Sequence, residues 1–393
     1  MMWIDAKKFR HYPIFFAATC LFLCNFLTLS LSFNAFGQAI YEQKGVFTVA
    51  NVYVDVTAKT ASAARKKALE KGEKEAFNLL LKRLTMRIDH NRLPVLDPEQ
   101  VSTYVKDFNV TNEKNSEIRY LANLTYRFKP NDIRLLLRDN EIQFAETISK
   151  PTLVLPVYQI AGAVFLWDDP NPWREAWLNE PKLIKTKIKK RMPGLVPMMF
   201  GKADLADIAT ISAELTVKGD MKSLMAITKK YKVAKTLVPF ASLRSSSEGA
   251  PVLEVRVTEY VQGNTRHVFS MQIKAKKMES VGPLLRRSAN IVISKIEELW
   301  KAENLLKFEN LGVVTATFSV NNLSEWVDAK RRLVKVAVIE KVEPVILSRR
   351  KVLLNIHFIG ELEQLKLALA QSDLNLTEKG NTWVLRLQKS IRF

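Results

Sequence analysis

The side chains of this chain best suited to recognise a ligand are three tryptophans in a central stretch. Trp173 and Trp177 are four residues apart after Pro172, so a helix beginning at the proline would place both indoles on one face. Trp167 and Asp168 come just before. Indoles beside a carboxylate can stack on a sugar ring or a base, and they can equally fill the contact between a helix and a sheet. We expect the packing role and keep the ligand role as the alternative.

Paired carboxylates follow the tryptophans. Asp204 and Asp207 are three residues apart, after Gly201 and Lys202. Two carboxylates at this spacing can serve acid–base chemistry or hold a divalent cation. Acidic residues in a first helical turn also accept hydrogen bonds from free backbone N–H groups and complement the helix dipole. We favour this capping role, and with it a structural Asp204.

Other catalytic patterns are absent from the sequence. His90, His267 and His357 fall in separate predicted domains without metal-ligand spacing, and there is no Gly-x-Ser-x-Gly nucleophile turn. The nearest approach to a phosphate loop, residues 194–202, has six residues between its glycines and is followed by Ala203. We therefore predict no enzyme, no metal site and no cofactor.

The beginning of the chain is typical of an export signal. Basic residues, the last of them Arg10, precede an apolar run from Ile14 to Phe33, and Gly37 and Ala39 then fit a signal-peptidase site. We expect residues 1–39 to be a signal peptide cleaved before Ile40, which places the mature protein in the periplasm. An uncleaved segment, long enough to anchor in the inner membrane, is the alternative.

The net charge of the chain indicates the kind of partner, and its cysteines indicate whether disulfides can form. Lys and Arg total 60 against 40 Asp and Glu, a formal charge of +20, which favours an anionic partner. In an exported protein that partner is an anionic membrane or wall surface rather than nucleic acid. The densest basic runs are 65–67, 185–191 and 349–351. Cys20 and Cys24 both lie in the signal, so the mature chain forms no disulfide.

Residues 40–146 predict a small α+β domain. Even-numbered residues from Val46 to Val56 alternate as on a strand, and Thr60 or Ser62 can cap a helix reaching Leu84. Two strands and a short helix are expected at 105–111, 118–128 and 133–138. The helix carries small residues on the face expected to meet the sheet: Ala61, Ala64, Ala68, Gly72, Ala76 and then Leu80.

Residues 151–303 predict a central three-layer α/β domain with a mixed sheet. Short continuous apolar runs, typical of strands buried on both faces, alternate with helical patterns and precede a hairpin. The expected strands are 153–158, 236–240, 252–261 and 267–274, and the expected helices are 172–179, 203–214, 221–230 and 280–300.

Residues 311–393 predict a C-terminal α+β domain. The order strand, helix, two strands, helix, strand is that of the split βαβ, or ferredoxin-like, fold. The expected strands are 313–320, 334–339, 352–358 and 383–387, and the expected helices are 323–333 and 362–371.

Several segments resemble one bacterial family. They are residues 80–85 at the end of the alanine-rich helix, 126–128, 153–157, 166–167 and 171–177. Together with the exported start, they make the chain similar to the exported proteobacterial family known as domain of unknown function 2066. The resemblance implies a Gram-negative envelope setting. It implies no activity, substrate or catalytic residue.

We interpret the sequence as a non-enzymatic periplasmic scaffold, adaptor or assembly factor. Its partner would be an envelope protein, or an anionic membrane or wall surface, with exposed strand edges open to strand addition. The alternative is a periplasmic protein that binds a small molecule or glycan at Trp167, Trp173 and Trp177. A hydrolase using Asp168 or Asp204 is a third hypothesis. Burial of the indoles separates packing from ligand binding.

Overall fold

A computed structural model describes residues 45–178, 194–246, 249–261, 263–306, 311–336, 338–380 and 382–388. The predicted signal segment and the basic run 185–191 lie outside these residues. The described chain is of mixed α and β structure with three sheets, which confirms the multidomain fold class.

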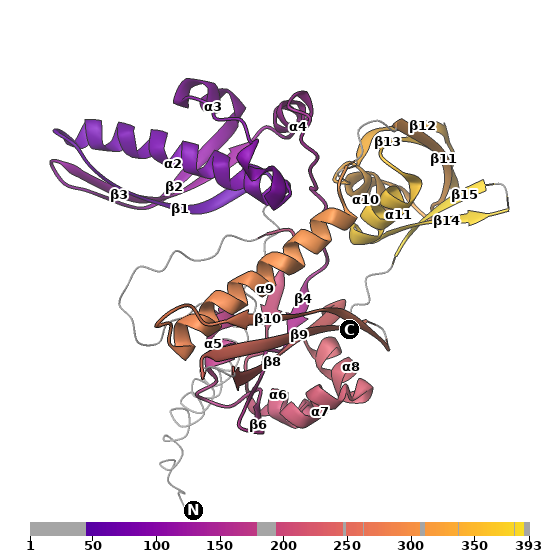
Figure 1. Cartoon of the computed structure of the whole chain (residues 1–393). Coiled ribbons are helices and arrows are strands. Elements are labelled where there is room, and N and C mark those ends of the chain that lie inside the picture. The colour runs from indigo at the N-terminus through magenta and orange to yellow at the C-terminus, as the bar shows by residue number, and fades with distance from the viewer. Residues whose placement is uncertain are drawn as a thin grey trace, which may run out of the picture. The chain divides into compact units, whose positions relative to one another are not determined.

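The first sheet is antiparallel, and one long helix packs on it. Its strand order is β1-β3-β2, and Figure 1 shows α2 lying along it. The elements are β1 (Thr48–Thr57), α2 (Ala61–Leu84), a 3-10 helix (Arg87–Asn91), α3 (Pro98–Tyr104), β2 (Val105–Asn115), β3 (Arg119–Phe128) and α4 (Pro130–Asp139).

Small residues bring α2 close to the sheet, as predicted. Thr60 caps the helix by accepting a hydrogen bond from the Ala63 N–H, and every member of the predicted stripe after Ala61 is buried. A Cβ added to Gly72 would lie 2.6 Å from Leu124 Cδ1 on β3. Glycine at this position therefore sets the closest approach of helix and sheet.

The predicted alternation along β1 is wrong in its first half. Val52 and Val54 are buried, but before them the buried residues are Phe47 and Val49. The pairing with β3 shifts between Val49 and Val52, where Asn51 has φ of 60°. This bulge inserts one residue and exchanges the two faces of the strand.

The central sheet is mixed, and helices cover part of each of its faces. Its main order is β10-β9-β8-β4-β7; β4 runs parallel to β7 and β8, whereas β8, β9 and β10 are antiparallel. The strands are β4 (Thr152–Val154), β5 (Val157–Ile160), β6 (Ala163–Phe165), β7 (Met198–Phe200), β8 (Lys235–Ser245), β9 (Pro251–Val261) and β10 (Asn264–Lys274).

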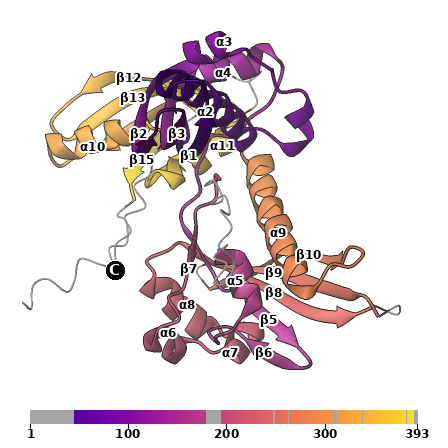
Figure 2. The same cartoon turned by 90° about the vertical axis from the view of Figure 1, so that its left-hand side faces the viewer.

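Helices cover the two faces of this sheet with separate apolar clusters. Leu237 and Val255 face α5 and α9, whereas Val238 and Tyr260 face α7 and α8. Figures 1 and 2 show α9 and the group α6–α8 on opposite sides. The predicted helix 203–214 is two helices, since Ser212 caps a new one. The helices are α5 (Pro172–Leu178), α6 (Leu205–Thr210), α7 (Ala213–Lys218), α8 (Met221–Lys230) and α9 (Val281–Glu303).

The third sheet has the order β12-β13-β11-β15-β14, with α10 and α11 on one face. It differs from the predicted four-stranded ferredoxin-like order, because β14 is an additional strand and β15 runs parallel to β11. The predicted strand 334–339 is wrong. The elements are β11 (Leu311–Ser319), α10 (Leu323–Leu333), β12 (Ile339–Leu347), β13 (Lys351–Ile359), α11 (Leu362–Gln371), β14 (Leu374–Lys379) and β15 (Thr382–Leu387).

Candidate functional site

The two helical tryptophans lie in the core of the central sheet. Trp173 and Trp177 are 0% and 1% exposed, and their rings meet edge to face with centroids 5.7 Å apart. Trp173 Nε1 donates a hydrogen bond of 2.9 Å to the Pro239 carbonyl on β8. Both indoles therefore join α5 to the sheet, and neither presents a ring to a ligand in this structure.

Trp167 and Asp168 also make local structural contacts. Trp167 Nε1 donates to the Ile211 carbonyl at 2.8 Å, and its ring lies against Gly201, where an added Cβ would come within 2.5 Å. An oxygen of Asp168 accepts a hydrogen bond from the Leu166 N–H at 3.1 Å. These contacts hold the loop before α5 in place.

Asp204 and Asp207 are brought together as a helix cap. Asp204 accepts from the Asp207 N–H at 2.8 Å, and Lys230 Nζ bonds both carboxylates. Asp207 is fully buried and also accepts from the Tyr231 hydroxyl at 2.6 Å. Burial, then this hydrogen bond to Asp207, raises the pKa of Tyr231 to about 12. Through their bonds to Lys230 and Tyr231, the two carboxylates hold α6 to the C-terminal end of α8.

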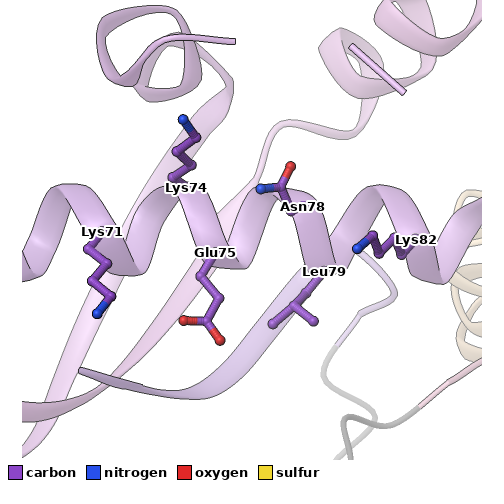
Figure 3. Close-up of a pocket in the computed structure, with 6 residues that line it drawn as sticks. All are labelled: Lys71, Lys74, Glu75, Asn78, Leu79 and Lys82. Atoms are coloured by element: carbon purple, nitrogen blue, oxygen red, sulfur yellow. The ribbon is translucent and has the colours of Figure 1, made fainter. Parts of the chain in front are cut away.

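A shallow hollow of about 420 Å³ lies on α2. All of its lining residues come from this one helix, and Figure 3 shows the side chains of Lys71 and Lys74 leaving it in opposite directions. Lining side chains that do not converge cannot enclose a ligand. The face is a solvated, mainly basic helix surface lined by Lys71, Lys74, Glu75, Asn78, Leu79 and Lys82.

A second hollow, of about 540 Å³, lies on the central sheet where four strands meet. Its polar residues occupy the sheet face opposite α9, beyond the part that α7 and α8 cover. Because alternate residues of a strand share a face, the polar lining residues of each strand are at every second position, whereas Val255 and Met271 between them belong to the apolar cluster on the α9 side. The lining residues are Gln159, Phe240, Ser242, Arg244, Glu254, Val255, Arg256, Ser270, Met271 and Gln272.

The charges in this central hollow leave one cation free. Arg244 lies 3.7 Å from Glu254, which also accepts from Gln272 Nε2 at 3.0 Å. The Arg256 guanidinium instead lies 5.3 Å from the centre of the Phe240 ring, and it forms no ion pair within the part of the chain that the structure describes. An exposed arginine beside an aromatic ring suits an acidic group of a partner.

Strand β10 forms one wall of the central hollow and one edge of the sheet. No strand of the described residues pairs with its outer side. From Phe269 to Lys274 its register with β9 is uninterrupted. The segment Val268–Ile273 contains no charged residue and no proline. Unpaired N–H and C=O groups along such an edge are a template for another strand.

The other long edges carry features that hinder strand addition. Strand β2 has two register shifts, and β12 has two together with Pro344. On β1, Arg83 Nη1 donates to the carbonyls of Val46 and Thr48, and Asp55 is charged. Strand β14 ends in Glu378 and Lys379. Bulges, charges and prolines are the usual protections of an edge.

No protein-family model matches the chain, and no curated protein matches it. Within the described residues no group of three or more His, Cys, Asp or Glu side chains is placed to hold a metal ion. No helix in that part of the chain is long and apolar enough to cross a membrane.

Sequence reasoning did not find the central hollow. Its polar residues lie on four strands and are as many as 113 positions apart in the sequence, from Gln159 to Gln272. Only the pairing of β8 with β5 and β9, and of β9 with β10, brings them together. The one sequence signal that could have indicated the hollow is the alternation of polar residues along the predicted hairpin 252–274.

Proposed function

We propose that this protein is a non-enzymatic adaptor of the bacterial cell envelope that binds an extended segment of a partner protein along strand β10. The single observation that carries the proposal is the outer edge of β10 from Phe269 to Ile273, which has no charged residue and no register shift with β9. Main-chain hydrogen bonds along such an edge supply affinity, and pockets for alternate side chains supply specificity. The exported start of the sequence supports the envelope setting.

The central hollow gives the added strand its selectivity. Ser270 and Gln272 on β10 are exposed at its border, and Arg256 lies on the next strand of the sheet. Side chains of a bound strand that point to this face would lie beside Ser270 and Gln272, and the long Arg256 side chain on the next strand, opposite Ser270, could reach them. The partner segment is therefore expected to carry an acidic residue at one of these positions.

Lysines placed on the edge test this function. Ser270→Lys with Gln272→Lys changes two exposed side chains, and a lysine at 272 can still pair with Glu254. We expect capture of the partner from the native envelope, measured by quantitative mass spectrometry, to fall at least about tenfold because edge charges oppose strand addition.

A matched variant controls for added charge. Asn375→Lys with Thr377→Lys places two lysines at exposed positions of another edge strand, β14. This variant should capture the same protein as the wild type. Equal loss in both variants, or no loss in either, contradicts binding along β10.

A small polar ligand is the second candidate, and the volume of the central hollow favours it. About 540 Å³ lies within the range of small-molecule sites. A ligand held by Arg256 and Phe240 would raise the melting temperature of the wild type in a screen of anionic metabolites and glycans, and would not do so after Arg256→Gln. Strand addition predicts no such shift.

A further inference from the structure

The end of the β12–β13 hairpin exposes three apolar side chains in succession. Val345, Ile346 and Leu347 are 54%, 56% and 63% exposed. Ile346 lies opposite Leu353 and Leu347 opposite Val352, so the two side chains point to opposite faces of the sheet. A strand end that is apolar on both faces is not explained by packing against one layer of helices.

Three cations follow this apolar end after Ser348. Arg349, Arg350 and Lys351 are exposed, and none of them forms an ion pair within the described residues. The segment 344–360 contains no Asp or Glu. The only acidic residue of β12 near this end, Glu343, is bonded to Lys341 and His357. The hairpin end therefore carries an uncompensated positive charge.

The turn holds these groups in one arrangement. Ser348 donates from its N–H and its hydroxyl to the Lys351 carbonyl, at 2.9 and 2.8 Å, and accepts from the Lys351 N–H at 3.1 Å. The Val320 N–H binds the Arg350 carbonyl at 3.0 Å. At the same end of the sheet, Leu323 begins α10 and is 73% exposed. The apolar and basic groups are thus presented together on ordered backbone.

We propose that this hairpin end, residues 345–351, docks on the surface of an anionic lipid bilayer. Val345, Ile346 and Leu347 would enter the boundary between headgroups and acyl chains, and the three cations would bind lipid phosphates. A protein strand is a poorer occupant, because Pro344 and two register shifts interrupt the edge of β12. This surface is independent of the proposed edge on β10.

A fluorophore at the hairpin end tests the docking. Leu347→Cys, in the full chain with Cys20→Ser and Cys24→Ser, is labelled with an environment-sensitive dye. Vesicles of phosphatidylglycerol and phosphatidylethanolamine should shift its emission to the blue, and spin-labelled acyl chains should quench it. The same dye at Thr377→Cys, exposed on β14, should not respond. A site-specific signal is needed because the apolar run 14–33 can bind lipid by itself.

The charge requirement provides a second readout. With Arg349→Gln, Arg350→Gln and Lys351→Gln combined, the vesicle concentration for half-maximal blue shift should rise about fivefold for each cation, on the order of 100-fold in total. Vesicles of phosphatidylcholine alone should give little shift. A dye at position 347 that stays in water with anionic vesicles, or a shift that the triple variant leaves unchanged, overturns the proposal.

Discussion

The guanidinium of Arg256 lies 5.3 Å from the centre of the Phe240 ring, on adjacent strands of the central sheet. Within the described residues Arg256 forms no ion pair, and it lies on the part of the sheet face that α7 and α8 do not cover, on the strand next to β10. We expect Arg256→Gln to weaken partner capture by up to about fivefold, since one exposed ion pair with the partner contributes up to about 1 kcal/mol. Arg256→Lys should retain most of the capture, which titration of immobilised protein measures. A glutamine variant that binds as well as the wild type would remove Arg256 from the site.

Because α2 lies so close to its sheet at Gly72, a large side chain at this position should destabilise the protein. A leucine there must displace Leu124 and Val54, which lie 2.6 and 3.0 Å from the first added atom. We expect Gly72→Leu to lower the free energy of unfolding by about 1–3 kcal/mol, the usual cost of overpacking. Lys74→Leu, at an exposed position of the same helix, should change it by less than about 0.5 kcal/mol. Urea unfolding followed by circular dichroism measures both variants.

If the Trp173 indole serves packing, its substitution should lower the free energy of unfolding. Trp173→Phe leaves the Pro239 carbonyl without its donor, and we expect a loss of about 1–3 kcal/mol in the free energy of unfolding. Trp173→Ala should cost about 3–5 kcal/mol because it also opens a cavity. Chemical denaturation gives both values. A variant at Trp173 that keeps full stability but loses a ligand would restore the glycan-binding hypothesis.

The connection between β10 and α9 should weaken in acid. Hydrogen bonds from Arg287, and then from the Lys276 N–H, lower the pKa of Glu279 from 4.5 to about 2, and Arg287 also donates to the Lys274 carbonyl at 2.8 Å. Below pH 4.5 the unfolded chain takes up this proton first, so the contribution to stability is complete above that pH and is lost as the pH falls toward 2. The difference in denaturation midpoint between wild type and Glu279→Gln should therefore shrink between pH 7 and pH 3. A difference that stays constant over that range argues against the pair.

Sequence periodicity predicted most of the elements because they bury one face. The α2 stripe from Ala64 to Leu80 follows helical spacing and packs as expected. Predictions failed where single residues changed the local geometry. Asn51 inserts a bulge in β1, and Ser212 starts a new helix within the predicted 203–214 segment.

The C-terminal errors have a similar origin. Val336 and Val338 are buried, so their apolar alternation resembles a strand, yet neither lies in one. Strand β14 was missed because it is short and alternates apolar with polar residues for only four positions, from Leu374 to Thr377. The candidate site was harder still, since the register of long strands, and not local spacing, places Arg256 beside Phe240.

The most direct test of the adaptor function is photocrosslinking from β10 in the native envelope. A photoreactive amino acid replaces Gln272, and a matched one replaces Thr377 on β14. We expect position 272 to capture one recurrent partner through an extended segment that carries an acidic residue. Position 377 should not capture this partner. No adduct at position 272, or the same adduct from both positions, would contradict binding along β10.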